Sequence, residues 1–104
     1  MRYLIDVKFT RVPPTMAKAA LALLEAAEAW NEKEKKAGRH IETWAKSDGS
    51  GLIVIVEAES NDVVYKKLYE NPYYPFCMYC VTPLTDMKLA FETGKNLLKP
   101  MAKG

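Results

Sequence analysis

No apolar run in the sequence approaches the roughly 20 residues that a membrane-spanning helix needs. Residues Met1 to Tyr3 lead directly into a strand pattern, without the apolar segment of a signal peptide. Charge of one sign is also scarce, because the formal net charge is +2 and the basic residues are interspersed with acids. We therefore expect a soluble, cytoplasmic protein whose partners include neither a membrane nor nucleic acid.

Residues that bind metals are few. Cys77 and Cys80 have the spacing of half a zinc or redox motif, and His40 is the only histidine. The two cysteines lie in a strand pattern, where residues three apart point to opposite faces. Their sulfurs could then neither form a disulfide nor bind one metal ion together. We expect two inert, buried thiols and no metal site.

The composition is that of one ordinary globular domain. With 104 residues, 49% of them hydrophobic and 27% charged, the chain can bury roughly two-thirds of its unfolded surface but cannot build two separate cores. We expect a single domain over residues 1–99 and a flexible tail over residues 100–104.

Hydrophobic periodicity predicts the order of the elements. Residues 2–10 alternate as a strand whose apolar side should face the chain's own helices. A turn at 12–15 leads to a helix over 16–37 that is capped by Gly38. Two strands, 39–46 and a central 52–58, flank a hairpin turn, and a short helix at 62–70 follows a Ser60 or Asn61 cap. The last helix follows Thr85 or Asp86 as its N-cap and has a stripe of Met87, Ala90, Phe91, Gly94 and Leu98.

Residues 71–84 are predicted to form the last strand, bounded by prolines. Alternation places Phe76, Met78 and Cys80 on one face, and Cys77, Tyr79 and Val81 on the other. Both faces are apolar, yet the chain has only enough helix to cover one of them. The second cover must therefore come from another subunit.

The predicted order is βαββαβ with an added C-terminal helix. This is the ferredoxin-like α+β arrangement, in which a four-stranded antiparallel sheet carries two helices on one side. The other side would expose Leu4, Trp44, Phe76, Met78 and Cys80. Because such a surface would aggregate, we expect a homodimer with packed sheets, which is a dimeric α+β barrel.

Several segments resemble the muconolactone isomerase family. Pro72-Tyr73-Tyr74-Pro75-Phe76 followed by Val81-Thr82-Pro83-Leu84 is similar to its closing strand. Val7-Lys8-Phe9-Thr10 and Trp44 are similar to its first and second strands, so the resemblance covers most of residues 3–84. It implies a cofactor-free isomerase of aromatic compound catabolism, which moves a proton on a small lactone in an oligomer of barrel dimers.

The sequence also departs from that family. The resemblance implies a histidine at the position of Asp6 and acidic residues near Met78 and Cys80, and none of these is present. The helix from about Asp86 to Lys99 is longer than the family implies. A base for proton transfer must therefore come from other residues.

Strand parity brings a replacement set to the uncovered face. The candidate catalytic residues are Asp6, Lys8, His40 and Glu42, with a carboxylate or imidazole as the base and Lys8 stabilising an enolate oxygen. The candidate substrate-binding residues, which would exclude water, are Trp44, Phe76, Met78 and Cys80. In the alternative interpretation, the charged residues only form ion pairs at the dimer seam or at strand ends.

A second pocket is possible between the sheet and the helices. It would be lined by aromatic residues suited to a flat or phenolic ligand, although an ordinary core has the same composition. These residues are Tyr3, Trp30, Tyr65, Tyr69, Tyr73 and Tyr79.

Three functions stay open at this point. The preferred one is an enzyme, a cofactor-independent isomerase of a small lactone or aromatic-derived metabolite. The second is a small-molecule-binding or regulatory barrel without chemistry, which is favoured if Lys8 and Lys46 neutralise Asp6 and Glu42. The third is a small monooxygenase-type barrel, cofactor-free or linked to haem, in which His40 would matter.

Overall fold

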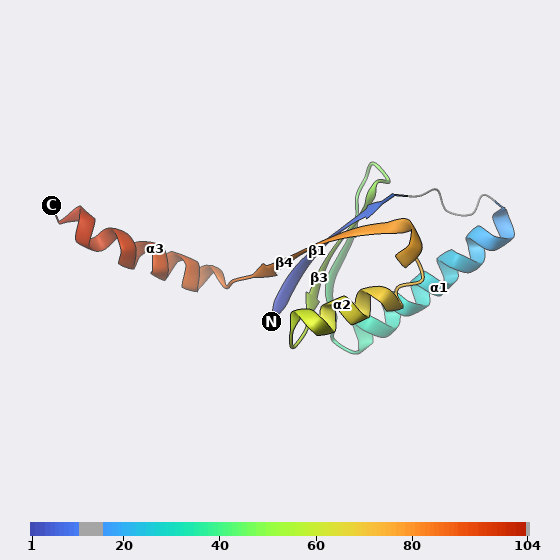
Figure 1. The fold of residues 1–104 in the computed structure, drawn as a ribbon, viewed down its shortest axis with the longest axis horizontal. Helices are drawn as coiled ribbons and strands as arrows, with labels where there is room; N and C mark the ends of the chain where they lie inside the picture. Colours follow the sequence, from blue (N-terminus) through green and yellow to red (C-terminus); the bar gives the residue numbers. More distant parts are fainter. Residues whose placement is uncertain (11–15, 104) are drawn as a thin grey trace.

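The computed structural model describes residues 1–10 and 16–103, so the predicted turn at 12–15 lies outside the described residues. The elements follow the predicted order βαββαβ and end in a third helix, α3 (Figure 1). Their bounds are β1 Arg2–Phe9, α1 Ala17–Lys36, β2 His40–Ala45, β3 Gly51–Glu57, α2 Asn61–Glu70, the 3-10 turn η1 Tyr74–Phe76, β4 Cys77–Leu84 and α3 Met87–Ala102.

The four strands form one antiparallel sheet in the order β2-β3-β1-β4. Helices α1 and α2 lie on the same side of it (Figure 1). This confirms the ferredoxin-like α+β class and the central position of β3. Strand β4, in contrast, lies at the edge of the sheet, and in this chain its residues are half-buried or exposed instead of fully covered.

The core lies between the sheet and α2. The side chains of β1 and β3 that point toward the helices are almost fully buried, with Tyr3 at 2% and Ile5 at 4% exposure. The other core residues are Val7, Val54, Val56 and Val64. The predicted helix-facing side of β1 is therefore confirmed for Tyr3, Ile5 and Val7.

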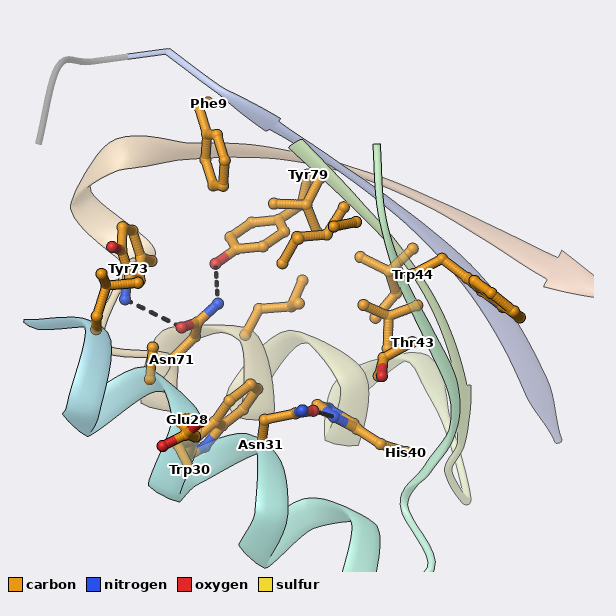
Figure 2. A pocket seen from close by; sticks show the side chains of 18 of the residues that line it. Phe9, Glu28, Trp30, Asn31, His40, Thr43, Trp44, Asn71, Tyr73 and Tyr79 are labelled. Carbon is orange, nitrogen blue, oxygen red and sulfur yellow. Dashed lines mark hydrogen bonds between the residues drawn. The ribbon is translucent and has the colours of Figure 1, made fainter. Parts of the chain in front are cut away.

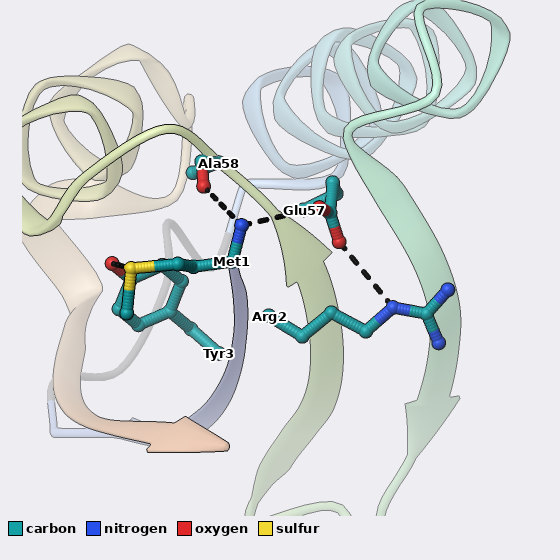
Figure 3. A network of polar contacts seen from close by, with 5 residues as sticks. All are labelled: Met1, Arg2, Tyr3, Glu57 and Ala58. Carbon is teal, nitrogen blue, oxygen red and sulfur yellow. Dashed lines mark hydrogen bonds and ion pairs between the residues drawn. The ribbon is translucent and has the colours of Figure 1, made fainter. Parts of the chain in front are cut away.

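The N-terminus holds the end of β1 against β3 (Figure 3). The Met1 ammonium donates to the Ala58 carbonyl oxygen at 2.9 Å and to Glu57 Oε1 at 3.2 Å, and Arg2 Nε donates to Glu57 Oε2 at 3.3 Å. Strand register is thus supported at this end by polar contacts that are exposed to solvent.

A buried carboxylate fixes the C-terminal half of α1. Glu34 is 1% exposed and receives hydrogen bonds from Arg39, while Lys67 Nζ of α2 lies 3.6 Å from Glu34 Oε1. Burial opposes ionisation, but the Arg39 hydrogen bond and the Lys67 charge outweigh it and hold the pKa of Glu34 below its usual value. Gly38, which follows the last residues of α1 and precedes Arg39, ends the helix with a positive φ of 75°.

The N-terminal half of α1 diverges from the sheet (Figure 1). Leu21 and Leu24 are each 57% exposed. Glu34 makes its buried contacts near the other end of the helix. A space therefore stays open between the N-terminal half of α1 and the sheet.

Helix α3 stands apart from the rest of the chain and extends beyond the end of β4 (Figure 1). The Cα radius of gyration is 18.2 Å, whereas a compact domain of this length has about 13 Å. The predicted tail from Pro100 is in part helical, because α3 continues through Pro100 to Ala102. Only the last helical turn lies beyond the proline, so few backbone hydrogen bonds are affected. Among the described helices, none combines the length and apolar character needed to cross a bilayer.

Candidate active site

The space between the sheet and α1 is a cavity of about 1150 Å³. Its walls are formed by the helix-facing side of the sheet, by α1 and by the end of α2 (Figure 2). Most of its lining is apolar or aromatic, and polar side chains converge on it at a few points. Its lining includes Phe9, Leu21, Leu24, Glu25, Glu28, Trp30, Asn31, His40, Thr43, Asn71, Tyr73 and Tyr79.

One polar cluster joins α1 to the start of β2. His40 Nδ1 lies 2.8 Å from Asn31 Oδ1. The Trp30 and His40 rings pack edge to face, with their centroids 5.0 Å apart. Because a carbonyl oxygen only accepts, this pairing requires the proton on Nδ1 and leaves Nε2 as the acceptor. Burial lowers the pKa of His40 below its usual 6.5, as do the charges of Arg39 and Lys35, whereas Glu34 acts in the opposite direction. The imidazole is therefore neutral at pH 7 and able to take up a proton.

A β-bulge places His40 in this cluster. His40 pairs with Val56 and Glu42 pairs with the next residue, Ile55, so β2 has one extra residue at Ile41. The extra residue turns His40 to the helix side, while Glu42 stays on the opposite face. The prediction that His40 shares a face with Glu42 and Trp44 is therefore wrong.

A second polar cluster lies at the end of α2. Asn71 Nδ2 donates to the Tyr79 hydroxyl oxygen at 3.1 Å, and the Tyr73 backbone N–H donates to Asn71 Oδ1 at 3.0 Å (Figure 2). Burial raises the pKa of Tyr79 well above its usual value of 10. The hydroxyl therefore stays protonated, so it can donate a hydrogen bond while its oxygen accepts from Asn71 and its neighbour in the strand is the Cys77 thiol.

The other candidate catalytic residues lie on the uncovered face of the sheet. Asp6 pairs with Cys80 and Lys8 pairs with Met78 across β1 and β4, and these side chains alternate with the buried ones. Lys46 Nζ lies 2.7 Å from Asp6 Oδ1, so this carboxylate is held in an ion pair. Lys8 and Glu42 are exposed. Asp6, Lys8 and Glu42 are thus separated from His40 by the sheet.

Three of the four candidate substrate-binding residues share that uncovered face, as predicted. Trp44 and Met78 are 65% and 61% exposed. Trp44 is also one of the residues that line the cavity, although its indole extends past the strands (Figure 2). Phe76 does not belong to this face, because it ends the turn η1 before β4 begins. Pro75 favours that turn, and the Phe76 ring meets Tyr73 at 6.2 Å.

The cysteines point to opposite faces, as predicted, since Cys77 pairs with Phe9 and Cys80 with Asp6. Both thiols are free. Cys80 is exposed, so the expectation that its thiol is buried is wrong. Burial raises the pKa of Cys77, which keeps it protonated. Within the described part of the chain, no three His, Cys, Asp or Glu side chains gather as a metal site would require.

The predicted second pocket therefore exists, with a changed lining. Trp30, Tyr73 and Tyr79 line it as expected. Tyr3 is buried in the core, and Tyr65 and Tyr69 contact each other on the exposed side of α2. Asn31 and Asn71 were missed. The spacing of Asn31 after Leu24 and Ala27 could have placed it on the cavity side of α1.

Two solved structures share this fold. A muconolactone isomerase structure superposes with a TM-score of 0.72 at 16% identity, over 83% of this chain and 90% of that one. A 5-chloro-2-hydroxyhydroquinone dehydrochlorinase from Burkholderia phenoliruptrix, in complex with 2,5-dihydroxybenzoquinone, gives 0.63 at 21% identity, over 82% and 94%.

Sequence comparison gives the family. No curated protein sequence shows a significant match to the chain. The family model described as muconolactone delta-isomerase matches residues 1–88, which span β1 to β4 and only the start of α3. The match covers most of the chain, so this protein belongs to the muconolactone delta-isomerase family.

Proposed function

We propose that this protein is a cofactor-independent isomerase, which moves a proton on a small lactone or a related metabolite derived from an aromatic compound. The reaction takes place in the cavity between the sheet and α1. The observation that carries the proposal is the hydrogen bond between His40 Nδ1 and Asn31 Oδ1, which leaves Nε2 as the acceptor in the cavity wall. Family membership and the enzymatic neighbours support the wider assignment to enzymes of aromatic catabolism.

The proposed step conserves atoms and electrons. His40 Nε2 takes a proton from the carbon next to the ring carbonyl, and the C–H electron pair moves into the enolate. The same nitrogen returns the proton to another carbon of the conjugated system, which restores the neutral imidazole. Tyr79, kept protonated by burial, donates a hydrogen bond to the enolate oxygen.

The names of the two neighbours suit such a site. One acts on a lactone and the other removes hydrogen chloride from a hydroxylated ring. Both reactions handle an oxygenated ring, and both need a group that accepts a proton. The aromatic walls and the two polar clusters of this cavity fit a flat molecule with a few oxygen atoms.

The test is turnover of muconolactone and related lactones, followed by ultraviolet absorbance and by deuterium uptake from solvent. His40→Gln is expected to lower kcat/KM by about 100-fold to 10,000-fold, the usual contribution of a general base. Glu42→Gln, on the uncovered face, serves as the matched control and changes kcat/KM by less than about threefold. In the unmodified protein, activity falls on the acid side only below pH 6.5, because the pKa of His40 is lowered.

If Glu42→Gln loses turnover while His40→Gln retains it, the reaction does not take place in the cavity between the sheet and α1.

A second candidate function, a binding barrel without chemistry, is favoured by one observation, the ion pair between Asp6 and Lys46. That alternative predicts a rise in Tm with bound lactones and neither turnover nor deuterium exchange. The oxygenase interpretation stays a prediction, and oxygen uptake during turnover would support it.

A further inference from the structure

Helix α3 has an apolar side that is largely exposed in the described chain. At 100° per residue, most of its apolar residues gather within half of the helix circumference. They are Met87, Ala90, Phe91, Gly94, Leu97, Leu98 and Met101, and we call them the α3 stripe. Phe91 is 60% exposed and Leu98 57%. Leu89, at 55%, lies on the opposite side of the helix and serves as an internal reference.

The polar side of α3 is basic. Lys88, Lys95 and Lys99 lie along one flank of the α3 stripe, with Glu92 between them. The helix also lies almost entirely beyond residue 88, where the family match ends. The features of α3 therefore belong to this chain and not to the shared domain.

A complementary surface borders the cavity on α1. Leu21, Leu24, Glu25 and Glu28 occupy one side of α1 by their spacing, and all four line the cavity while remaining exposed. We call them the α1 rim. Its two leucines match the apolar α3 stripe, and its two carboxylates match the lysines that flank the stripe.

The α3 of the same molecule does not cover this rim. It leaves β4 after Leu84, which pairs with Arg2, and extends away from the body (Figure 1). The α1 rim lies in the half of α1 that diverges from the sheet. Without a cover, the cavity stays open to solvent, whereas an enclosed site would strengthen the hydrogen bonds made inside it.

We propose that α3 of a second copy of this chain docks on the α1 rim and closes the cavity. The α3 stripe packs against Leu21 and Leu24, and its lysines approach Glu25 and Glu28. The site is then complete only in the assembled protein. The catalytic consequence rests on the proposed function, but the docking itself is measured without substrate.

The experiment uses photo-cross-linking of the full chain. p-Benzoylphenylalanine replaces Phe91, and equal amounts of 14N-labelled and 15N-labelled protein are mixed and irradiated. Mixed-isotope cross-links are expected in the tryptic peptide of residues 19–33, which contains the whole rim. The same photoreactive residue at position 89 is expected to give at least tenfold less of this product.

Two substitutions sharpen the result in the position-91 background. Leu98→Glu is expected to reduce the cross-link at least tenfold, whereas Leu89→Glu, a matched change on the other side of the helix, leaves it unchanged. Lys95→Glu with Lys99→Glu is expected to weaken the cross-link, and so is Glu25→Lys with Glu28→Lys. The variant that carries all four substitutions is expected to restore it. Circular dichroism confirms that each variant is folded.

The proposal is overturned by cross-links confined to one chain, by mixed-isotope cross-links only to the uncovered sheet face, or by none. It is also overturned if α3 instead binds vesicles of phosphatidylglycerol and phosphatidylcholine and the Leu98→Glu variant does not, because that result identifies a membrane as its partner. A loss of turnover in His40→Gln with the cross-link intact separates the catalytic proposal from this one.

Discussion

The two faces of the sheet are built from alternate residues of the same strands, yet they differ in almost every property. On the helix side, Tyr3 and Ile5 are nearly inaccessible. His40 donates a hydrogen bond to Asn31, and Tyr79 accepts one from Asn71, so both side chains are oriented. On the uncovered side, Trp44 and Met78 are mostly exposed.

The difference shows what a second layer contributes. Helices supply partners that fix a polar side chain in one tautomer and one position, and the low dielectric near them shifts its pKa. The uncovered side has no such partners within the described chain, and its Asp6 is neutralised by Lys46. This contrast supports the proposed chemistry on the helix side and the expected pairing of two sheets through the uncovered side.

The largest expected effect tests burial on the helix side. Ile5→Ala removes a side chain that is 4% exposed and is expected to lower the free energy of unfolding by about 2–5 kcal/mol. Met78→Ala, on the uncovered face, is expected to cost less than about 0.5 kcal/mol. Urea denaturation at low protein concentration, where association does not contribute, measures both. Equal losses in the two variants would contradict the contrast between the faces.

Self-association through the uncovered face gives the second prediction. If two sheets pair as expected from the sequence, Trp44 becomes buried between them, and Trp44→Lys is expected to raise the dissociation constant of that homodimer by about tenfold or more, because a charge replaces an aromatic anchor. Sedimentation equilibrium measures the change. Tyr65→Lys is the matched control, since Tyr65 is similarly exposed but lies on α2. If both variants dissociate equally, the sheet face is not the interface.

The third comparison concerns ion pairs. Glu34→Gln alters a carboxylate that is 1% exposed between Arg39 and Lys67, and a loss of about 1–3 kcal/mol in the free energy of unfolding is expected. Asp6→Asn alters a pair that is partly exposed, so the expected loss is below about 1 kcal/mol. Thermal unfolding at two salt concentrations should show a salt-dependent contribution mainly for Asp6. A costlier Asp6→Asn would reverse this ranking.

The smallest effect is the pH dependence from His40. Its pKa in the folded chain lies below the value of 6.5 for the free group, so the unfolded chain binds more protons as the pH falls below about 6.5. The stability present above pH 6.5 is therefore lost as the pH falls through the folded-state pKa. Denaturation at pH 5 and 7.5 should give a smaller difference for His40→Gln than for the unmodified protein. An unchanged difference would place the imidazole in a solvated setting.

Much of the division between the two faces could be predicted from single residues. Alternation along β1 and β4 placed Leu4, Met78 and Cys80 opposite Tyr3, Ile5 and Tyr79. This succeeds because side-chain direction in a regular strand depends only on the parity of the residue number. The resemblance to muconolactone isomerases also led to the correct family.

The errors arise where pairing, and not local pattern, sets the direction of a side chain. The bulge at Ile41 exists only because β2 pairs with β3 in a given register, and it transfers His40 to the other face. Phe76 lies outside the strand in which it was predicted, because Pro75 and its neighbours form a turn. The cavity itself depends on Glu34, which fixes one half of α1 and leaves the other half free to diverge.

The amino-acid sequence by itself determined the order of the elements, the apolar sides of the strands and the stripe of α3, because each depends on periodicities of two or about 3.6 residues. Only the tertiary structure decided which face holds the one imidazole, which amides orient His40 and Tyr79, and where α1 separates from the sheet. Those features depend on contacts between residues far apart in the chain, and no local pattern contains them.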